Sequence, residues 1–233
     1  MPQVLARVGT ALRALQKGEF VVVADDEERE NEGDLIIAAE SLTTEKLAFM
    51  LRHTSGVVCV AITGRRANEL ALPLMVAENN EPHRTQFTVS VDLAAGIATG
   101  ISAADRGRTI RALGNPEAGA ASFLRPGHVF PLRARNNGVL ERRGHTEAAV
   151  DLARLAGFQP AGALCELMAD DGSMLCGAAL VEFAERHALP YLHIGDLVAY
   201  RRATERRVSL NTTGLGVAQD ALSQHYLLPE VHA

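Results

Sequence analysis

The sequence predicts an α/β (α+β) fold in which helices cover a mixed β-sheet. Short apolar runs typical of buried strands alternate irregularly with segments whose apolar residues recur at helical spacing. The turn signal Asn136-Asn137-Gly138 lies between two further strand-like runs and predicts a hairpin, which a purely parallel sheet does not contain. No internal repeat or long linker interrupts this pattern. We therefore expect a single domain over residues 1–208 and a C-terminal tail, partly ordered at most, over 209–233.

The strands are predicted from apolar and β-branched runs that are bounded by turn residues. These runs cover residues 20–24, 35–39, 57–62, 87–92, 129–134, 139–142, 161–168 and 192–194. Residues 87–92 alternate apolar and polar side chains, so this strand is expected to have one face in water.

The helices are predicted from apolar residues three or four positions apart and from the residues that cap them. They cover about residues 4–16, 43–55, 65–72, 102–114, 145–157, 178–188 and 196–206. Residues 76–86 are polar and irregular, which predicts a mobile loop.

Composition excludes several classes of protein. Hydrophobic residues make up 47% of the 233 and charged residues 22%, and the three cysteines show no CxxC spacing, which argues against a disulfide framework or a structural zinc site. No apolar run approaches the roughly 18 residues of a membrane span, and the N-terminus lacks the apolar core of a signal peptide. The net charge of −5 and the aromatic content of 4% argue against nucleic acid as the main partner. We expect a cytoplasmic protein.

The segment 25–34, DDEERENEGD, carries seven carboxylates and one arginine. Carboxylates packed together raise one another's pKa, and a hard cation such as Mg²⁺ relieves that repulsion because it prefers oxygen ligands. A solvated acidic loop is the simpler interpretation of the composition alone. The position between two buried strands, and the backbone freedom of Gly33, favour a divalent-metal site instead.

A second candidate site is RRGHTE, residues 142–147, where a predicted strand ends and a helix begins. Free backbone N–H groups at a helix start attract anions such as phosphate, Arg142 could neutralise that charge, and His145 is a plausible metal ligand. Ordinary helix capping by Thr146 explains the same residues equally well.

The remaining candidates carry weaker signals. His128 follows Pro126 and Gly127, and a turn residue fits it better than a catalyst. Glu166 stands in an otherwise apolar strand, so it lies at the exposed strand end or acts as a general acid or base. The run 102–109 could bind an anion, but its serine and aspartate are also the commonest structural caps.

Taken in order, these pieces resemble the 3,4-dihydroxy-2-butanone 4-phosphate synthase family of riboflavin biosynthesis, over about residues 4–205. The matching blocks are DDEERENEGDLIIAAE (25–40), AFMLRHTSGVVCVAIT (48–63), FTVSVD (87–92), TGISAADR (99–106), RPGHVFPLRAR (125–135), GVLERRGHTEAAVDLARLAGFQPAGALCELMADDG (138–172) and DLVAYRR (196–202).

The resemblance implies a stand-alone lyase that converts D-ribulose 5-phosphate to L-3,4-dihydroxybutan-2-one 4-phosphate and formate. It implies Mg²⁺ or Mn²⁺ as the cofactor, with two ions in each active site. The fold that it implies is a three-layer α/β/α sandwich around a mixed twisted sheet, in a homodimer whose active site lies near the interface.

The resemblance also implies residue roles. Glu30 and His145 are the expected metal ligands, and His128 and Glu166 the expected catalytic residues. The expected substrate-binding residues are Arg29, Glu30, Asp34, Arg142, Arg143, Gly144, His145, Thr146 and Glu166. Asp25, Asp26, Glu27 and Glu28 are expected to form a solvated approach to the site. The sequence departs from the family pattern at Gln86, where a small residue is usual, and around Cys176, where a basic residue is usual.

Two alternatives stay open. A metal-dependent sugar-phosphate isomerase or aldolase would share the first, enediol-forming step. The same general fold also occurs in a nucleotide- and RNA-binding family, so a non-catalytic binding module is the second alternative.

Overall fold

A single mixed sheet organises the chain in the computed structural model, which describes residues 2–213, with side chains as far as 205. The strands lie in the order β4-β5-β3-β6-β2-β1-β7. Their bounds are β1 (Val21–Ala24), β2 (Gly33–Ala38), β3 (Cys59–Thr63), β4 (Val91–Leu93), β5 (Phe123–Ala134), β6 (Ala161–Glu166) and β7 (Tyr191–His193). The β3–β5 and β1–β7 pairs are parallel and the other neighbours antiparallel, so the sheet is mixed, as the sequence predicts.

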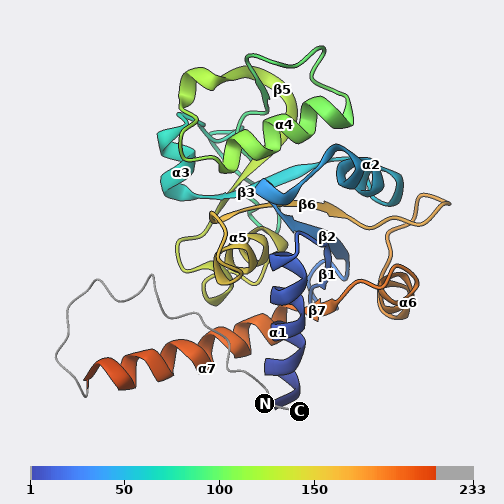
Figure 1. The fold of residues 1–233 in the computed structure, drawn as a ribbon, viewed down its shortest axis with the longest axis vertical. Helices are drawn as coiled ribbons and strands as arrows, with labels where there is room; N and C mark the ends of the chain where they lie inside the picture. The colour runs from blue at the N-terminus through green and yellow to red at the C-terminus, as the bar shows by residue number, and fades with distance from the viewer. Residues whose placement is uncertain (1, 214–233) are drawn as a thin grey trace.

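Helices cover both faces of this sheet (Figure 1). One layer consists of α1 (Pro2–Gln16), α5 (His145–Leu155) and α7 (Ile194–Thr213), and the other of α2 (Thr44–His53), α3 (Gly64–Glu69), α4 (Ala103–Gly114) and α6 (Ala178–Arg186). Alternate strand residues point to opposite faces. Val21 and Val23 therefore join the apolar core under the first layer, and Val22 joins the core under the second. This arrangement confirms the three-layer α/β/α sandwich.

Most predicted elements form at their expected places, with shifted ends. β2 begins at Gly33 instead of residue 35, so Asp34 belongs to a strand and not to the acidic loop. α7 continues to Thr213, past the expected end at 206. The tail predicted over 209–233 lies mostly outside the described residues, and the domain boundary at 208 stays a prediction. None of the described helices, α7 included, has the length and apolar character needed to cross a membrane.

The hairpin predicted at Asn136-Asn137-Gly138 is wrong. After β5 the chain turns into a short 3-10 helix, Gly138–Leu140, and then into α5 instead of returning along β5. Gly138 has φ +54°, and the Asp151 carboxylate lies where its Cβ would be. That carboxylate accepts the Val139 N–H at 2.9 Å and pairs with Arg201 at 2.8 Å. Gly138 is therefore required in a turn that the buried ion pair of Asp151 and Arg201 holds in place.

The strand predicted over 87–92 is mostly wrong. Only Val91–Leu93 forms a strand, while Phe87 and Thr88 make isolated bridges to Leu132 and Leu74. Pro131 of β5 lacks a backbone N–H, so it accepts a hydrogen bond from Thr88 at 3.0 Å but returns none. The hydrogen-bond ladder between this segment and β5 is therefore interrupted.

Candidate active site

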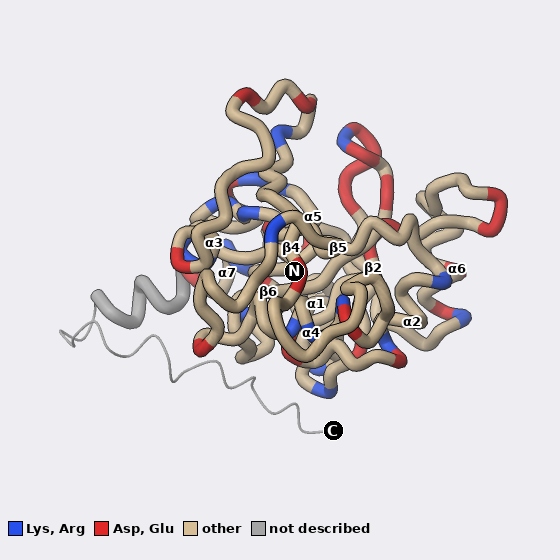
Figure 2. Tube along the Cα trace, turned by 90° about the horizontal axis from the view of Figure 1, so that it is seen from above, with Lys and Arg blue, Asp and Glu red and all other residues tan. Residues whose placement is uncertain are grey.

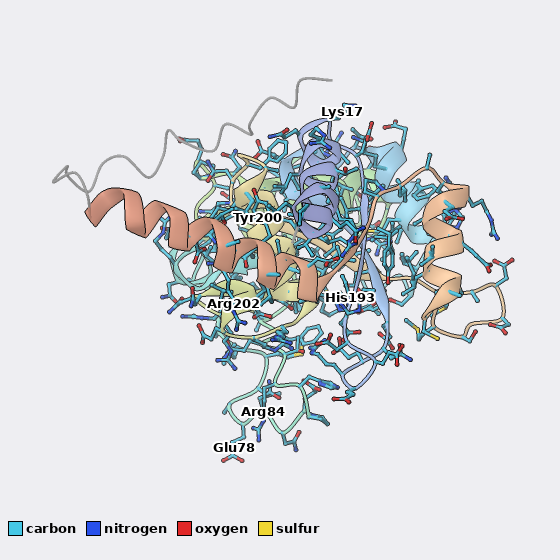
Figure 3. The ribbon with its side chains drawn as sticks, turned by 90° about the horizontal axis from the view of Figure 1, so that it is seen from below. Lys17, Glu78, Arg84, His193, Tyr200 and Arg202 are labelled. Carbon is cyan, nitrogen blue, oxygen red and sulfur yellow. The ribbon has the colours of Figure 1, made fainter. Side chains whose placement is uncertain are left out.

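A pocket of about 200 Å³ lies at the ends of the central strands β2 and β6. Two loops that contribute to its lining project from the same side of the molecule (Figures 2 and 3). One loop is the acidic segment that joins β1 to β2, coloured red with a blue arginine in Figure 2. The other is the 76–86 loop, on which Figure 3 labels Glu78 and Arg84. The predicted site residues that line the pocket are Arg29, Glu30, Asp34, Arg142, His145, Thr146 and Glu166.

His145 is the buried first residue of α5, and its ring orientation is fixed by the backbone of β1. Nε2 lies 3.1 Å from the Val23 carbonyl oxygen. Because a carbonyl oxygen only accepts, Nε2 carries a hydrogen and donates it. Nδ1 then faces the Glu30 carboxylate at 3.4 Å and the Asp34 carboxylate at 3.7 Å. An imidazole held in this way by its far nitrogen is oriented as metal-binding histidines are.

The charges around His145 are coupled. Burial alone would lower the pKa of His145, but the carboxylates of Asp34, Glu30 and Asp25 raise it to about 9. Burial raises the pKa of Asp34 to about 7, although His145 acts in the opposite direction. The pKa of Glu30 is lowered to about 2, because His145 and Arg29 outweigh the effect of its burial. The cluster therefore favours a positive charge at its centre.

The donor atoms of this cluster fit a divalent cation. Asp25, Glu30 and His145 offer ligand atoms that all lie within 4.8 Å of one another. Asp34 adds a buried oxygen, Oδ1, which has no hydrogen-bond partner in the described part of the chain. Carboxylate oxygens with one imidazole suit Mg²⁺ or Mn²⁺.

Asp25 is not the solvated residue that was expected. Its buried carboxylate accepts hydrogen bonds from the backbone N–H groups of Glu30 and Glu32, both at 3.0 Å, and from Arg29 at 2.9 Å. These bonds fold the acidic loop back on itself and turn Glu30 towards His145. The only signal in the sequence was its place directly after a buried strand, whereas Glu27 and Glu28 are exposed as expected.

Arg142 connects the start of α5 to the 76–86 loop. Its guanidinium donates to Glu147 at 2.7 Å, to the Thr85 hydroxyl at 2.7 Å and to the His83 carbonyl at 3.1 Å. Glu147, which the sequence reasoning missed, is buried and also accepts the Arg135 N–H at 3.0 Å. The loop is irregular, as predicted, and it closes one wall of the pocket through Glu81 and Thr85.

Arg143 and Gly144 do not line the pocket. Arg143 is half exposed and lies 3.8 Å from Asp26 of the acidic loop. Gly144 precedes α5, and the Arg142 guanidinium lies where a Cβ would be. In the stretch 142–146, which was predicted to bind substrate as a unit, Arg142, His145 and Thr146 thus line the pocket, whereas Arg143 and Gly144 do not.

Glu166 ends β6 and is the register partner of Asp34 on β2. Its Oε2 accepts the Ser55 hydroxyl at 2.6 Å. Residues directly opposite across two strands project from the same face of the sheet, so both carboxylates reach the pocket.

His128 lies outside the pocket. It is an exposed residue of β5 whose Nδ1 is 2.6 Å from the Asp92 carboxylate. Within one chain, the structure does not bring it together with Glu30 and His145. Gln86 and Cys176, the two departures from the family pattern, do not line the pocket either.

The arrangement combines three chemical capabilities in one polar pocket. Glu30 and His145 could hold a cation, the carboxylates of Asp34 and Glu166 could exchange protons, and the start of α5 with Arg29 could bind an anion. These are the groups needed to enolise a ketone that carries a phosphate.

Comparisons with known proteins point to one family. A family model described as 3,4-dihydroxy-2-butanone 4-phosphate synthase matches residues 9–200. The chain is 52% identical over 203 residues to the protein of that name from Yersinia enterocolitica, covering 87% of this chain and 94% of the relative. The one from Aeromonas salmonicida is 55% identical over the same shares. A crystal structure of 3,4-dihydroxy-2-butanone 4-phosphate synthase in complex with two magnesium ions is similar with a TM-score of 0.83 at 47% identity, covering 85% of this chain and 97% of that one.

Proposed function

The chain belongs to the 3,4-dihydroxy-2-butanone 4-phosphate synthase family of riboflavin biosynthesis, and from this premise we propose that it converts D-ribulose 5-phosphate to L-3,4-dihydroxybutan-2-one 4-phosphate and formate. The observation that supports the reaction most directly is the cluster of Glu30, Asp34 and His145 beside Glu166. In this cluster a cation held by Glu30 and His145 would lie beside carboxylates that can transfer protons.

Glu30 and His145 would hold Mg²⁺ or Mn²⁺, with a second ion of the same kind in the acidic pocket. A bound ion would supply a Lewis acid for the negative charge that develops on the sugar oxygens. Arg29 and the first N–H groups of α5 bind the phosphate, which does not react, so that its binding energy positions the other end of the sugar.

The carboxylates act on the reacting carbons. Removal of the proton next to the ketone gives an enediol, and Glu166 and Asp34 are two of the carboxylates lining the pocket that can accept and return protons. Dehydration and a skeletal rearrangement follow. Addition of one water, which replaces the one lost, then releases one carbon as formate, so that the atoms of the substrate balance those of the two products. The 76–86 loop and Arg142 close the pocket wall and exclude water from the reactive intermediates.

The site is completed in a homodimer. His128 is exposed, is paired with Asp92 and lies away from the pocket of its own chain. His128 can therefore have a catalytic role if it enters the pocket of a second copy across a two-fold interface.

Formate release tests the function. Purified protein supplied with D-ribulose 5-phosphate and Mg²⁺ is expected to yield one formate for each four-carbon product. A sugar-phosphate isomerase would yield a five-carbon isomer and an aldolase two sugar fragments, so the absence of formate at every enzyme concentration overturns the proposal. RNA affinity with a steep salt dependence, without turnover, would support the binding-module alternative.

A further inference from the structure

Ser55 lies in the turn between α2 and β3 and is bound to the end of β6 by two hydrogen bonds. Its hydroxyl donates to Glu166 Oε2 at 2.6 Å, and its backbone N–H donates to the Glu166 carbonyl oxygen at 2.9 Å. The neighbouring Thr54 forms an isolated antiparallel bridge with Leu167. The hydroxyl is thus placed against the Glu166 carboxylate by the backbone hydrogen bond of Ser55 and by the bridge of the preceding residue.

The direction of the hydroxyl proton follows from its surroundings. The Val57 N–H donates to Ser55 Oγ at 3.3 Å, which uses one of its lone pairs. The hydroxyl of Ser55 carries a single proton, which it donates to Glu166 Oε2. The sulfur of Cys165 lies 3.4 Å from Ser55 Oγ. Burial raises the pKa of Cys165 to about 11, so the thiol stays neutral beside the serine.

The two carboxylate oxygens of Glu166 differ in their hydrogen bonding. Oε2 accepts from the Ser55 hydroxyl at 2.6 Å and from the Cys165 thiol at 3.9 Å, whereas Oε1 makes no hydrogen bond within the part of the chain that the structure describes. Glu166 lines the pocket and Ser55 does not. A substrate in the pocket therefore meets Glu166, with Ser55 behind it.

We propose that Ser55 is a positioning residue that holds Oε2 of Glu166, so that Oε1 alone is presented to the reacting proton. A glutamate side chain has several freely rotating bonds, and ordering them is unfavourable in entropy unless a partner holds the carboxylate in advance. A displacement of about 1 Å at a reacting group lowers rates by roughly a hundredfold. The inference rests on the proposed function, in which Glu166 moves a proton.

Ser55→Ala tests the inference by removing the hydroxyl while the backbone hydrogen bond remains. We expect kcat for formate release to fall roughly tenfold to a hundredfold, with KM within about twofold of the wild type, because Ser55 does not line the pocket. Ser55→Thr keeps a hydroxyl at this position and should recover most of kcat.

A double-mutant cycle separates positioning from a general structural effect. In a Glu166→Gln background, Ser55→Ala should change the residual kcat by less than about twofold, because the group that it positions is already disabled. Ser173→Ala is the matched control. It removes a serine–carboxylate hydrogen bond of the same 2.6 Å length, to Asp171 on an exposed turn, and should leave kcat unchanged.

Different results would overturn the role of Ser55 and the proposed function. Wild-type kcat in Ser55→Ala, or equal losses from Ser55→Ala in the wild-type and Glu166→Gln backgrounds, overturns the role of Ser55 and leaves the proposed function intact. Wild-type protein that releases no formate overturns the proposed function itself. A fall in the melting temperature of Ser55→Ala with unchanged kcat at 25 °C assigns Ser55 a structural role only, and so also overturns the inference.

Discussion

Asp34 and Glu166 are directly opposite residues of the antiparallel strands β2 and β6, and both carboxylates line the same pocket. Asp34 is buried and faces His145, whereas Glu166 is held by Ser55. Two carboxylates that share one face of the sheet thus have different partners.

Glu30→Gln is expected to abolish turnover without unfolding the protein. The change removes the negative charge that faces His145 while keeping the side-chain shape, so kcat should fall by at least about a hundredfold. His145→Ala should have the same effect. The measurement is formate release together with circular dichroism of each variant. Glu28→Gln, an exposed residue of the same loop, is the control and should retain activity.

Removal of divalent cations should stop the reaction reversibly. The cluster of Glu30, His145 and the buried Asp34 oxygen gathers negative charge that a divalent ion would balance. Dialysis against EDTA is expected to eliminate formate release, and added Mg²⁺ or Mn²⁺ should restore it. Full activity after exhaustive chelation, verified by metal analysis, would contradict the metal assignment.

Mg²⁺ affinity should rise with pH between about 7 and 9. The pKa of His145 in the metal-free protein is raised from 6.5 to about 9, so the ring stays protonated through neutral pH. Mg²⁺ must displace that proton, and its apparent affinity should therefore increase by up to roughly tenfold per pH unit until pH reaches about 9. Calorimetry in buffers of different ionisation enthalpy would detect the released proton. His145→Asn should bind more weakly and lose this proton release.

The same pKa shift predicts how the stability of the metal-free protein depends on pH. Because the pKa of His145 is higher in the folded protein than in the unfolded chain, protonated His145 stabilises the fold. This stabilisation is fully present below about pH 6.5 and is lost as the pH rises through about 9. The melting temperature of chelated protein should fall over this range, and His145→Asn should weaken the dependence. A melting temperature that rises from pH 7 to pH 9 would be incompatible with a protonated His145.

Mixed dimers test whether His128 acts in the pocket of a second copy. His128→Ala and Glu30→Gln should each be inactive alone. In a two-fold dimer of one copy of each, one site carries both changes and the other carries neither, so an equal mixture should recover roughly a quarter of wild-type activity. The assay requires refolding or co-expression of the two variants. No recovery from verified mixed dimers would place His128 outside the partner's site.

Arg142 should control the order of the 76–86 loop. Arg142→Met removes its hydrogen bonds to Thr85 and to the His83 carbonyl, so backbone amides of the loop should exchange hydrogen roughly tenfold faster. Hydrogen-exchange mass spectrometry measures this directly. Arg143→Met is the matched control, because Arg143 contacts Asp26 and not this loop. Equal exchange in the two variants would show that the loop is held by its own internal hydrogen bonds.

Local sequence was sufficient for the elements whose cores are continuous in the chain. The valines of β1 and the apolar spacing of α1 follow from residues within one segment, and both elements form where they were predicted. The proposed metal ligands Glu30 and His145 lie far apart in sequence, and only the family resemblance paired them.

The features that the sequence did not predict depend on long-range partners. The turn at Gly138 depends on Asp151 and Arg201, which are contributed by α5 and α7. The contact between Ser55 and Glu166 joins residues 111 positions apart, and no local pattern marks it. Asp25 is buried because the loop closes over it, and that closure is set by backbone hydrogen bonds that composition cannot reveal.

The position of β6 has a consequence for how the chain is made. β6 lies between β2 and β3 in the middle of the sheet, yet it is synthesised only after β1 to β5. Until the ribosome has passed Glu166, the β1–β2 hairpin and the β3–β5 pair each present an open edge where β6 belongs. Open edges of this kind are templates for pairing between chains. Ribosome-bound or truncated chains that end before residue 161 are therefore expected to aggregate, and the yield of folded protein is expected to depend on how quickly a nascent chain acquires its central strand.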